Sequence, residues 1–297
     1  NETNLGTART INRGLTITES EYLVRADQDD VSLPTRIERQ IDFLENSPAT
    51  DVVCSWEHAI DDDGNRLWDW KAEIENYGEF LGPVLLGLCP IWHPSIVFRT
   101  KALISAGGFN ADYVGAEDFE VTTRMALKRF NAAVMPEFLL LQRQHGKSQS
   151  VHLGSSMTNA TRRIHIETLR HFIGGQLVDE FAEFLRTASL PPIRRGCKCR
   201  ILKFNEMIRE LFASTERKQS LSTNEARKLK IVFMKRLGLG LFFCHKFKFV
   251  PEFFFNLLFT MFSPLTHRGL RRSVAGMYRV YRSIRLFDVK KRTKTYI

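Results

Sequence analysis

Three aspartates lie close together in residues 25–30, which read RADQDD. The side chains of Asp27, Asp29 and Asp30 repel one another when ionised, and a chain accepts that cost most readily where a divalent cation neutralises them. Mg²⁺ or Mn²⁺ usually takes only one or two protein carboxylates and completes its coordination with phosphate oxygens and water. The run therefore predicts a metal-bound diphosphate; a solvated acidic loop is the alternative explanation.

An acidic pair, Glu117-Asp118, and two basic residues, Arg143 and His145, are further candidates. A carboxylate can act as the general base that takes a proton from an attacking hydroxyl, although spacing alone favours an ordinary acidic first helical turn for this pair. Imidazole suits transition metals and guanidinium suits phosphate, so Arg143 and His145 are candidates for binding a diphosphate or its metal. A capping or loop role for His145 is equally open.

Aromatic residues could add a surface for a sugar. Trp56, Trp68 and Trp70 offer rings on which a sugar can stack, although aromatic side chains more often pack in a core. His93 follows Trp92 and is a candidate for a place near an acceptor, whereas a histidine packed against an aromatic ring is the plainer explanation.

The elements that must hold these side chains alternate between strands and helices. Residues 21–26 are a short β-prone run that ends at the acidic cluster, as a buried strand does where it delivers side chains to a site. Pro34 suits the first turn of a helix over residues 34–46. The later strands are predicted at residues 51–60, from 66 onward, 94–99 and 132–141, with a hairpin turn at 61–65, an amphipathic segment at 77–88, and helices at 100–108 and 117–130. This alternation predicts an α/β sheet domain over residues 1–150.

The second half of the sequence differs in pattern and charge. Helical periodicity recurs in it at residues 158–172, 176–187, 200–213 and 224–236, with linkers predicted at Pro191-Pro192 and at residues 214–223. Residues 1–150 contain 14 Lys and Arg against 23 Asp and Glu, a net charge of −9, whereas residues 151–297 contain 29 against 10, a net charge of +19. Two regions with different partners are therefore predicted.

The cysteines and the polar first residues indicate the compartment. The five cysteines are odd in number and scattered, which is no disulfide framework, and this favours a reducing cytoplasm. The first residues are polar and do not have the pattern of a signal peptide. The basic half lacks a motif with aromatic stacking residues at fixed spacing, so nucleic acid is not an expected partner.

Residues 1–150 resemble the inverting nucleotide-sugar glycosyltransferases of family 2. The resemblance is carried by ordered blocks at residues 4–6 (NLG), 12–15 (NRGL), 21–30 (EYLVRADQDD), 32–34 (SLP), 36 (R), 40 (Q), 93–95 (HPS), 107–109 (GGF), 117–118 (ED) and 143–145 (RQH). It implies an α/β fold with a GT-A-like, Rossmann-like mixed sheet, followed by an α-helical C-terminal region. It also implies transfer of a sugar, with a UDP-sugar as the expected donor, to an acceptor hydroxyl with inversion, in the biosynthesis of a cell-surface polysaccharide or other glycan.

The resemblance assigns roles to three carboxylates. Asp27 and Asp29 match the family's D-x-D motif, in which the first carboxylate lies by the ribose and the second reaches Mn²⁺ or Mg²⁺ on the diphosphate. Asp118 matches the family's general base. A carboxylate on the opposite side from the leaving diphosphate can deprotonate the acceptor hydroxyl as it attacks the anomeric carbon, and a single displacement of this kind inverts the configuration.

Four further residues complete the expected site. Asn12, Arg25 and Arg143 are expected to bind the nucleotide sugar, and His145 is an expected metal ligand beside the two aspartates of the motif. Gln28 stands where the family more often has a small residue, which is expected to be tolerated because that side chain should point away from the metal.

One departure from the family suggests a different function. Family members begin with two strands that hold the nucleotide base, and neither block is found in the sequence, so the catalytic domain of residues 1–150 is expected to lack about a βαβ unit at its N-terminus. A catalytically inactive glycosyltransferase-like scaffold is the main alternative function, and a basic nucleic-acid-binding protein is a weaker one.

The basic region, residues 151–297, has two explanations. Basic residues at 194–236 precede a phenylalanine-rich stretch at 242–262, which predicts either an interfacial membrane anchor or a helical extension packed on the catalytic domain. Residues 249–265 are too short and too polar for a spanning helix. An anchor would suit a glycan or lipid-linked glycan acceptor and a protein that is cytoplasmic, in peripheral contact with the cytoplasmic face of the inner membrane.

Overall fold

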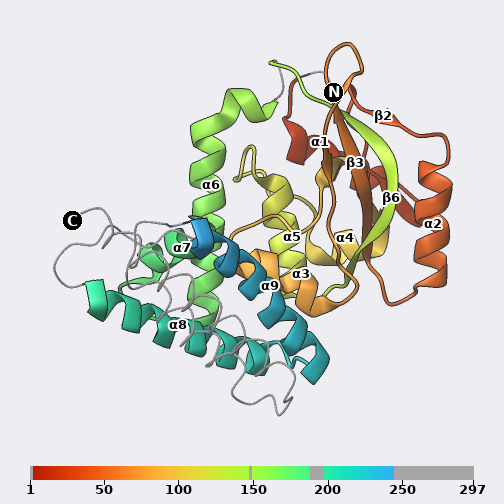
Figure 1. Cartoon of the computed structure of the whole chain (residues 1–297). Coiled ribbons are helices and arrows are strands. Elements are labelled where there is room, and N and C mark those ends of the chain that lie inside the picture. The colour runs from red at the N-terminus through yellow and green to blue at the C-terminus, as the bar shows by residue number, and fades with distance from the viewer. Residues whose placement is uncertain (1–2, 147–148, 188–196, 244–297) are drawn as a thin grey trace, which may run out of the picture.

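The computed structural model describes residues 3–146, 149–187 and 197–243 (Figure 1). Its described strands form a mixed sheet in the order β1-β5-β3-β6-β2, and β4 pairs with β3 at the side. The pairing of β3 with β6 is parallel, and the other pairings are antiparallel. The strands are β1 (Tyr22–Val24), β2 (Val31–Ser32), β3 (Val52–Ile60), β4 (Arg66–Trp70), β5 (Val97–Arg99) and β6 (Ala132–Arg143). The predicted mixed α/β class is confirmed.

Both faces of this sheet are covered by helices, and the alternation of side chains along β3 explains why. Val53 packs with Leu44 of helix α2 in one apolar cluster, whereas its neighbours Val52 and Cys54 belong to the larger cluster on the other face. Figure 1 shows α2 on one side of the sheet and α3, α4 and α5 on the other. A strand buried on both faces reads as a continuous apolar run, which is the pattern that the sequence shows at residues 52–54.

The described helices before the basic half include one that the sequence analysis did not predict. The helices are α1 (Thr7–Ile17), α2 (Arg36–Asn46), α3 (Tyr77–Leu85), α4 (Thr100–Ala106) and α5 (Glu117–Leu127). Helix α1 was not predicted, because it is polar on average and only two of its residues, Ala8 and Leu15, are buried. Helix α3 is buried along most of its length, so its predicted amphipathic character is wrong.

The basic half folds into helices α6 (Gln149–Phe172), α7 (Val178–Thr187), α8 (Cys197–Lys218) and α9 (Thr223–Phe243). The prediction of a linker at residues 214–223 is wrong for residues 214–218, since α8 continues to Lys218. Ala213, Glu216 and Arg217 are good helix formers, and this propensity outweighs the neighbouring Ser and Thr. Residues 191–192, the other predicted linker, lie outside the described part of the chain.

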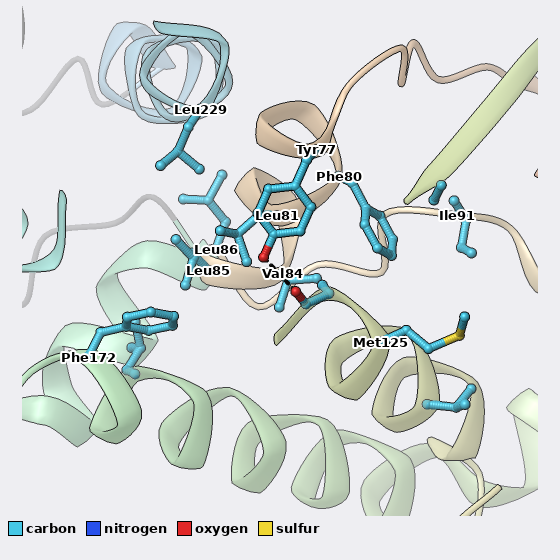
Figure 2. Close-up of a cluster of buried hydrophobic side chains, with 14 of the residues drawn as sticks. Tyr77, Phe80, Leu81, Val84, Leu85, Leu86, Ile91, Met125, Phe172 and Leu229 are labelled. Carbon is cyan, nitrogen blue, oxygen red and sulfur yellow. Dashed lines mark hydrogen bonds between the residues drawn. The ribbon is translucent and has the colours of Figure 1, made fainter. Parts of the chain in front are cut away.

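Helix α9 packs against α3 of the sheet domain, α6 packs against α3 and α5, and α7 and α8 pack on α6. Figure 2 shows Tyr77 and Leu81 of α3 beside Leu229 of α9 and Phe172 of α6, and all four belong to one buried cluster that also includes residues of β3. The described part of the basic half is therefore a helical extension on the sheet domain. No helix within the described residues is long and apolar enough to cross a membrane. Residues 249–265 lie outside the described residues.

Candidate active site

The acidic run, residues 25–30, connects β1 to β2, which are the two ends of the main strand order, so the loop must cross from one edge of the sheet to the other. Hydrogen bonds at both ends hold it. The backbone N–H of Arg25 donates to the carbonyl of Ile96 at 2.9 Å. At the other end, the backbone N–H of Arg143 donates to the Asp30 carboxylate, also at 2.9 Å. The loop is therefore placed by β5 on one side and β6 on the other.

Arg25 connects the loop to a segment almost seventy residues further along. Its Nη2 lies 2.5 Å from the Asp27 carboxylate, and its Nη1 lies 2.6 Å from Nδ1 of His93. His93 is buried, and burial and the nearby charge of Arg25 hold its pKa well below the usual range. The ring is therefore neutral and accepts the hydrogen bond from Arg25.

Asp29 meets the end of the loop after β6. Nε2 of His145 lies 2.7 Å from the Asp29 carboxylate, and this hydrogen bond is the main cause that lowers the pKa of Asp29. The guanidinium of Arg143 donates to the backbone carbonyls of Asp29, Asp61 and Asp62. The structure thus brings together Asp29, Arg143 and His145, and their roles in binding a metal or a diphosphate stay predictions.

Beneath the loop lies a buried charge network that sequence reasoning missed. The guanidinium of Arg36 is fully buried and donates to the Arg25 carbonyl at 2.5 Å, to the Ser32 hydroxyl at 2.8 Å and to Gln40 at 3.1 Å. Glu57 is 1% exposed, and burial raises its pKa to about 8. Neither Glu57 oxygen has a hydrogen-bond partner among the described residues. A glutamate within the apolar strand 51–60 was the signal that could have indicated it.

Asp118 lies in the first turn of α5 and faces the same group of charges. The backbone N–H of Phe119 donates to its Oδ1 at 2.7 Å, which fixes the carboxyl group. Burial and the charge of Glu117 raise the pKa of Asp118, and the charge of Arg25 opposes this shift. Asp118 and Asp27 therefore both interact with Arg25, although more than ninety residues separate them in sequence.

Asn12 has a different surrounding from the other predicted residues. Its side-chain amide donates to the carbonyl of Phe109 at 2.7 Å and accepts from the Phe109 N–H at 2.8 Å. A Cβ on Gly108 would lie 2.6 Å from the Asn12 amide oxygen, so the glycine allows this close approach. Asn12 positions the Gly108-Phe109 turn, and its contact with a nucleotide sugar stays a prediction.

The predicted metal ligands fit a cation that is shared with a diphosphate. No group of three or more His, Cys, Asp or Glu in the described ranges is arranged to hold a metal ion by itself. A Mg²⁺ or Mn²⁺ ion that binds substrate phosphates needs only one or two protein ligands. Asp29 is exposed, its lowered pKa keeps it ionised at neutral pH, and His145 lies beside it. This donor pair suits such an ion.

Comparison with known proteins shows that this chain is similar to glycosyltransferases. Residues 1–157 match the family described as "Glycosyltransferase like family 2". An uncharacterized glycosyltransferase of Methanocaldococcus jannaschii is 29% identical over 48% of this chain and 49% of its own. The amylovoran biosynthesis glycosyltransferase AmsE of Erwinia amylovora is 29% identical over 54% of this chain and 56% of its own. The chain thus spans about half the length of these relatives.

One relative carries a name that states a reaction. The Escherichia coli UDP-Gal:alpha-D-GlcNAc-diphosphoundecaprenol beta-1,3-galactosyltransferase is 24% identical over 38% of this chain and 40% of its own.

Proposed function

The chain belongs to the glycosyltransferase-like family 2, and we propose that it transfers a sugar from a nucleoside-diphosphate sugar to an acceptor hydroxyl with inversion, in a metal-dependent reaction. The observation that carries the proposal is the position of Arg25, whose side chain is bonded to Asp27 and His93 and interacts electrostatically with Asp118. The proposed base, Asp118, and the proposed donor-binding loop, residues 25–30, come from distant parts of the sequence, and both have a carboxylate near the guanidinium of Arg25.

In the proposed reaction Asp118 accepts the proton of the acceptor hydroxyl as that oxygen attacks the anomeric carbon. A pKa raised by burial makes its carboxylate a stronger base, and the Phe119 N–H holds one of its oxygens in place. The C–O bond to the diphosphate breaks in the same displacement, and the sugar is inverted.

The departing diphosphate gains negative charge, which the loop is equipped to receive. Arg25 and Arg143 supply guanidinium groups, which bind phosphate oxygens well. Asp29 and His145, with Asp27 as the further expected ligand, would hold Mn²⁺ or Mg²⁺, and a metal there would supply positive charge to offset the charge on the phosphate.

Turnover of nucleotide sugars by the full chain tests this function. The release of nucleoside diphosphate would be measured with UDP-, GDP- and dTDP-sugars in the presence of Mn²⁺. We expect release with at least one donor, with a loss of about a hundredfold or more in Asp118→Asn and in Asp29→Ala. An absence of turnover with every donor would favour the inactive scaffold, whereas turnover that both variants retain would refute the roles proposed for Asp118 and Asp29.

We further propose a glycan or lipid-linked glycan acceptor and a cytoplasmic protein in peripheral contact with the inner membrane. The E. coli relative is named for a sugar on diphosphoundecaprenol, and residues 151–297 carry a net charge of +19, which favours anionic lipid surfaces. The full chain should therefore cosediment with anionic vesicles and less with neutral ones. Equal recovery in the two pellets would contradict the electrostatic part of the proposal.

A further inference from the structure

Three tryptophans form a contiguous row of aromatic rings next to the candidate active site. The ring centroid of Trp92 lies 5.4 Å from that of Trp70 and 6.2 Å from that of Trp68. Trp68 and Trp70 are two residues apart on β4, so both side chains leave the same face of the strand. Trp68 is 43% exposed, and it is the only exposed Phe, Tyr or Trp among the described side chains.

The row is continuous with the groups around the acidic loop at two points. Trp92 immediately precedes His93, whose ring is bonded to Arg25. Trp70 is the cross-strand partner of Glu57, so these two side chains lie on the same face of the sheet. Glu57 in turn interacts electrostatically with Asp30. The row therefore borders the site and is not an isolated surface patch.

The segment that carries Trp92 also runs past the proposed base. Cys89, three residues earlier, packs against the buried cluster that contains Ala116 and Phe119, close to Asp118 in the sequence, and its thiol donates to the carbonyl of Ile91 at 3.2 Å. The segment thus runs from beside Asp118 to His93, and Trp92 lies between these two points. Since the base must face the acceptor hydroxyl rather than the diphosphate, this places the row on the acceptor side.

We propose that Trp68, supported by Trp92 and Trp70, binds a pyranose ring of a glycan acceptor by stacking. The inference rests on the glycosyl transfer proposed above and names the acceptor as a carbohydrate at this point. One face of a pyranose presents C–H groups with partial positive charge, and the face of an indole ring carries partial negative charge. Trp92 stands at 89° to Trp68 and fixes that ring edge-to-face, so little side-chain entropy is lost on binding.

Binding of simple sugars is the first test, because it requires no turnover. The sequence contains four tryptophans, so the indole N–H region of an ¹⁵N spectrum of the full chain contains four signals, and Trp68→Phe identifies one of them. Methyl pyranosides of glucose, galactose, mannose and N-acetylglucosamine would be titrated in, with octyl phosphate as an alkyl probe. We expect a saturable shift of the Trp68 signal with at least one pyranoside. No such shift, or a shift with octyl phosphate alone, would overturn the proposal.

Acceptor kinetics give the second test, with a control on the same strand. Leu67 is 52% exposed and precedes Trp68, so its side chain leaves the opposite face of β4. With an acceptor glycan that the unmodified protein uses, Trp68→Ala should raise the acceptor KM about tenfold. Trp68→Phe keeps an aromatic ring and should bring the acceptor KM most of the way back to that of the unmodified protein. Leu67→Ala should change the acceptor KM by less than about twofold. Equal acceptor KM values in Trp68→Ala and Leu67→Ala would overturn the stacking role.

These two tests separate the inference from the proposed function. A saturable pyranoside shift in a protein without turnover of any donor would leave the binding surface in place and refute glycosyl transfer. Turnover with an unchanged acceptor KM in Trp68→Ala would leave glycosyl transfer in place and refute the surface.

Discussion

The guanidinium of Arg25 and the imidazole of His93 are joined by a 2.6 Å hydrogen bond between Nη1 and Nδ1. An arginine can only donate, so Nδ1 of His93 accepts and the proton of the neutral ring is on Nε2. The other end of the guanidinium is held by Asp27. Arg25 is therefore fixed from two sides, and His93 acts as a positioning residue for a cation of the candidate active site.

His93→Leu should lower kcat/KM for donor turnover by about tenfold or more, because Arg25 loses one of its two partners. His93→Asn should recover much of this loss, since an amide oxygen can accept the same hydrogen bond. The initial rate of nucleoside diphosphate release measures both variants, and thermal unfolding checks that each is folded. Equal losses in the two variants would show that packing, and not the hydrogen bond, is what His93 contributes.

Arg36 provides a second prediction, on stability. Arg36→Met removes the cation that lies beside Glu57 and leaves the Arg25 carbonyl without its donor. We expect a loss of about 3 kcal/mol in the free energy of unfolding, since the Arg25 carbonyl, the Ser32 hydroxyl and the Gln40 amide oxygen all lose the donor that satisfies them. Arg39, one turn later, is half-exposed and paired with Glu137 on the surface, so Arg39→Met should cost no more than about 1 kcal/mol. Urea denaturation compares the two, and similar midpoints would contradict the role of Arg36.

The sequence alone was sufficient for the parts of this protein that depend on local pattern. The strands at residues 51–60 and 132–141, the hairpin turn between β3 and β4, and the helix that begins at Glu117 were all predicted, because apolar periodicity and turn residues mark them. The position of the acidic run after a strand was also predicted. The link between Asp27 and Asp118 was not predicted, because Arg25, which pairs locally with Asp27, is near Asp118 only through the tertiary fold.

Buried charge was the hardest feature to predict from the sequence. Arg36 and Gln40 are four residues apart on α2, a spacing that indicates one helix face, but an exposed face is the usual place for such residues. Their complete burial follows from the loop that α2 supports. The two-residue strand β2 was missed for a related reason, since it is too short for a periodic pattern and is held by its pairing with β6.

His165 gives a prediction for pH. It is 1% exposed, and burial lowers its pKa to about 4 from an ordinary value of 6.5. Between these values the unfolded chain binds more protons than the folded one, so stability falls as the pH falls. This group contributes a loss of about 2 kcal/mol between pH 7.5 and pH 5.

His165→Gln keeps a donor for the Leu85 carbonyl, which Nε2 of His165 contacts at 3.0 Å, and cannot titrate. Urea denaturation at pH 7.5 and pH 5 should therefore show a smaller pH-dependent loss in this variant. His171, an exposed histidine six residues later in α6, provides the control, and His171→Gln should change the pH dependence less. An unchanged dependence in His165→Gln would contradict the prediction.

The close approach of α3 and α9 gives the last prediction. A Cβ on Gly78 would lie 2.1 Å from the backbone carbonyl oxygen of Glu225, and one on Gly82 would lie 2.8 Å from Val232. Backbone atoms cannot rotate away as a side chain can, so Gly78→Ala must push α9 from its place. We expect it to lower the free energy of unfolding by about 2 kcal/mol, although alanine favours a helix by about 1 kcal/mol over glycine.

Gly14 in α1 separates these two effects, because a Cβ there would meet nothing within 4 Å. Gly14→Ala should therefore raise the free energy of unfolding by up to about 1 kcal/mol through helix propensity alone. Urea denaturation of the full chain measures both variants. We expect the free energy of unfolding to fall in Gly78→Ala and to rise in Gly14→Ala, because the sheet domain and the basic helices unfold as one unit across this contact. Stabilisation in both variants would mean that α9 does not lie against α3 in solution.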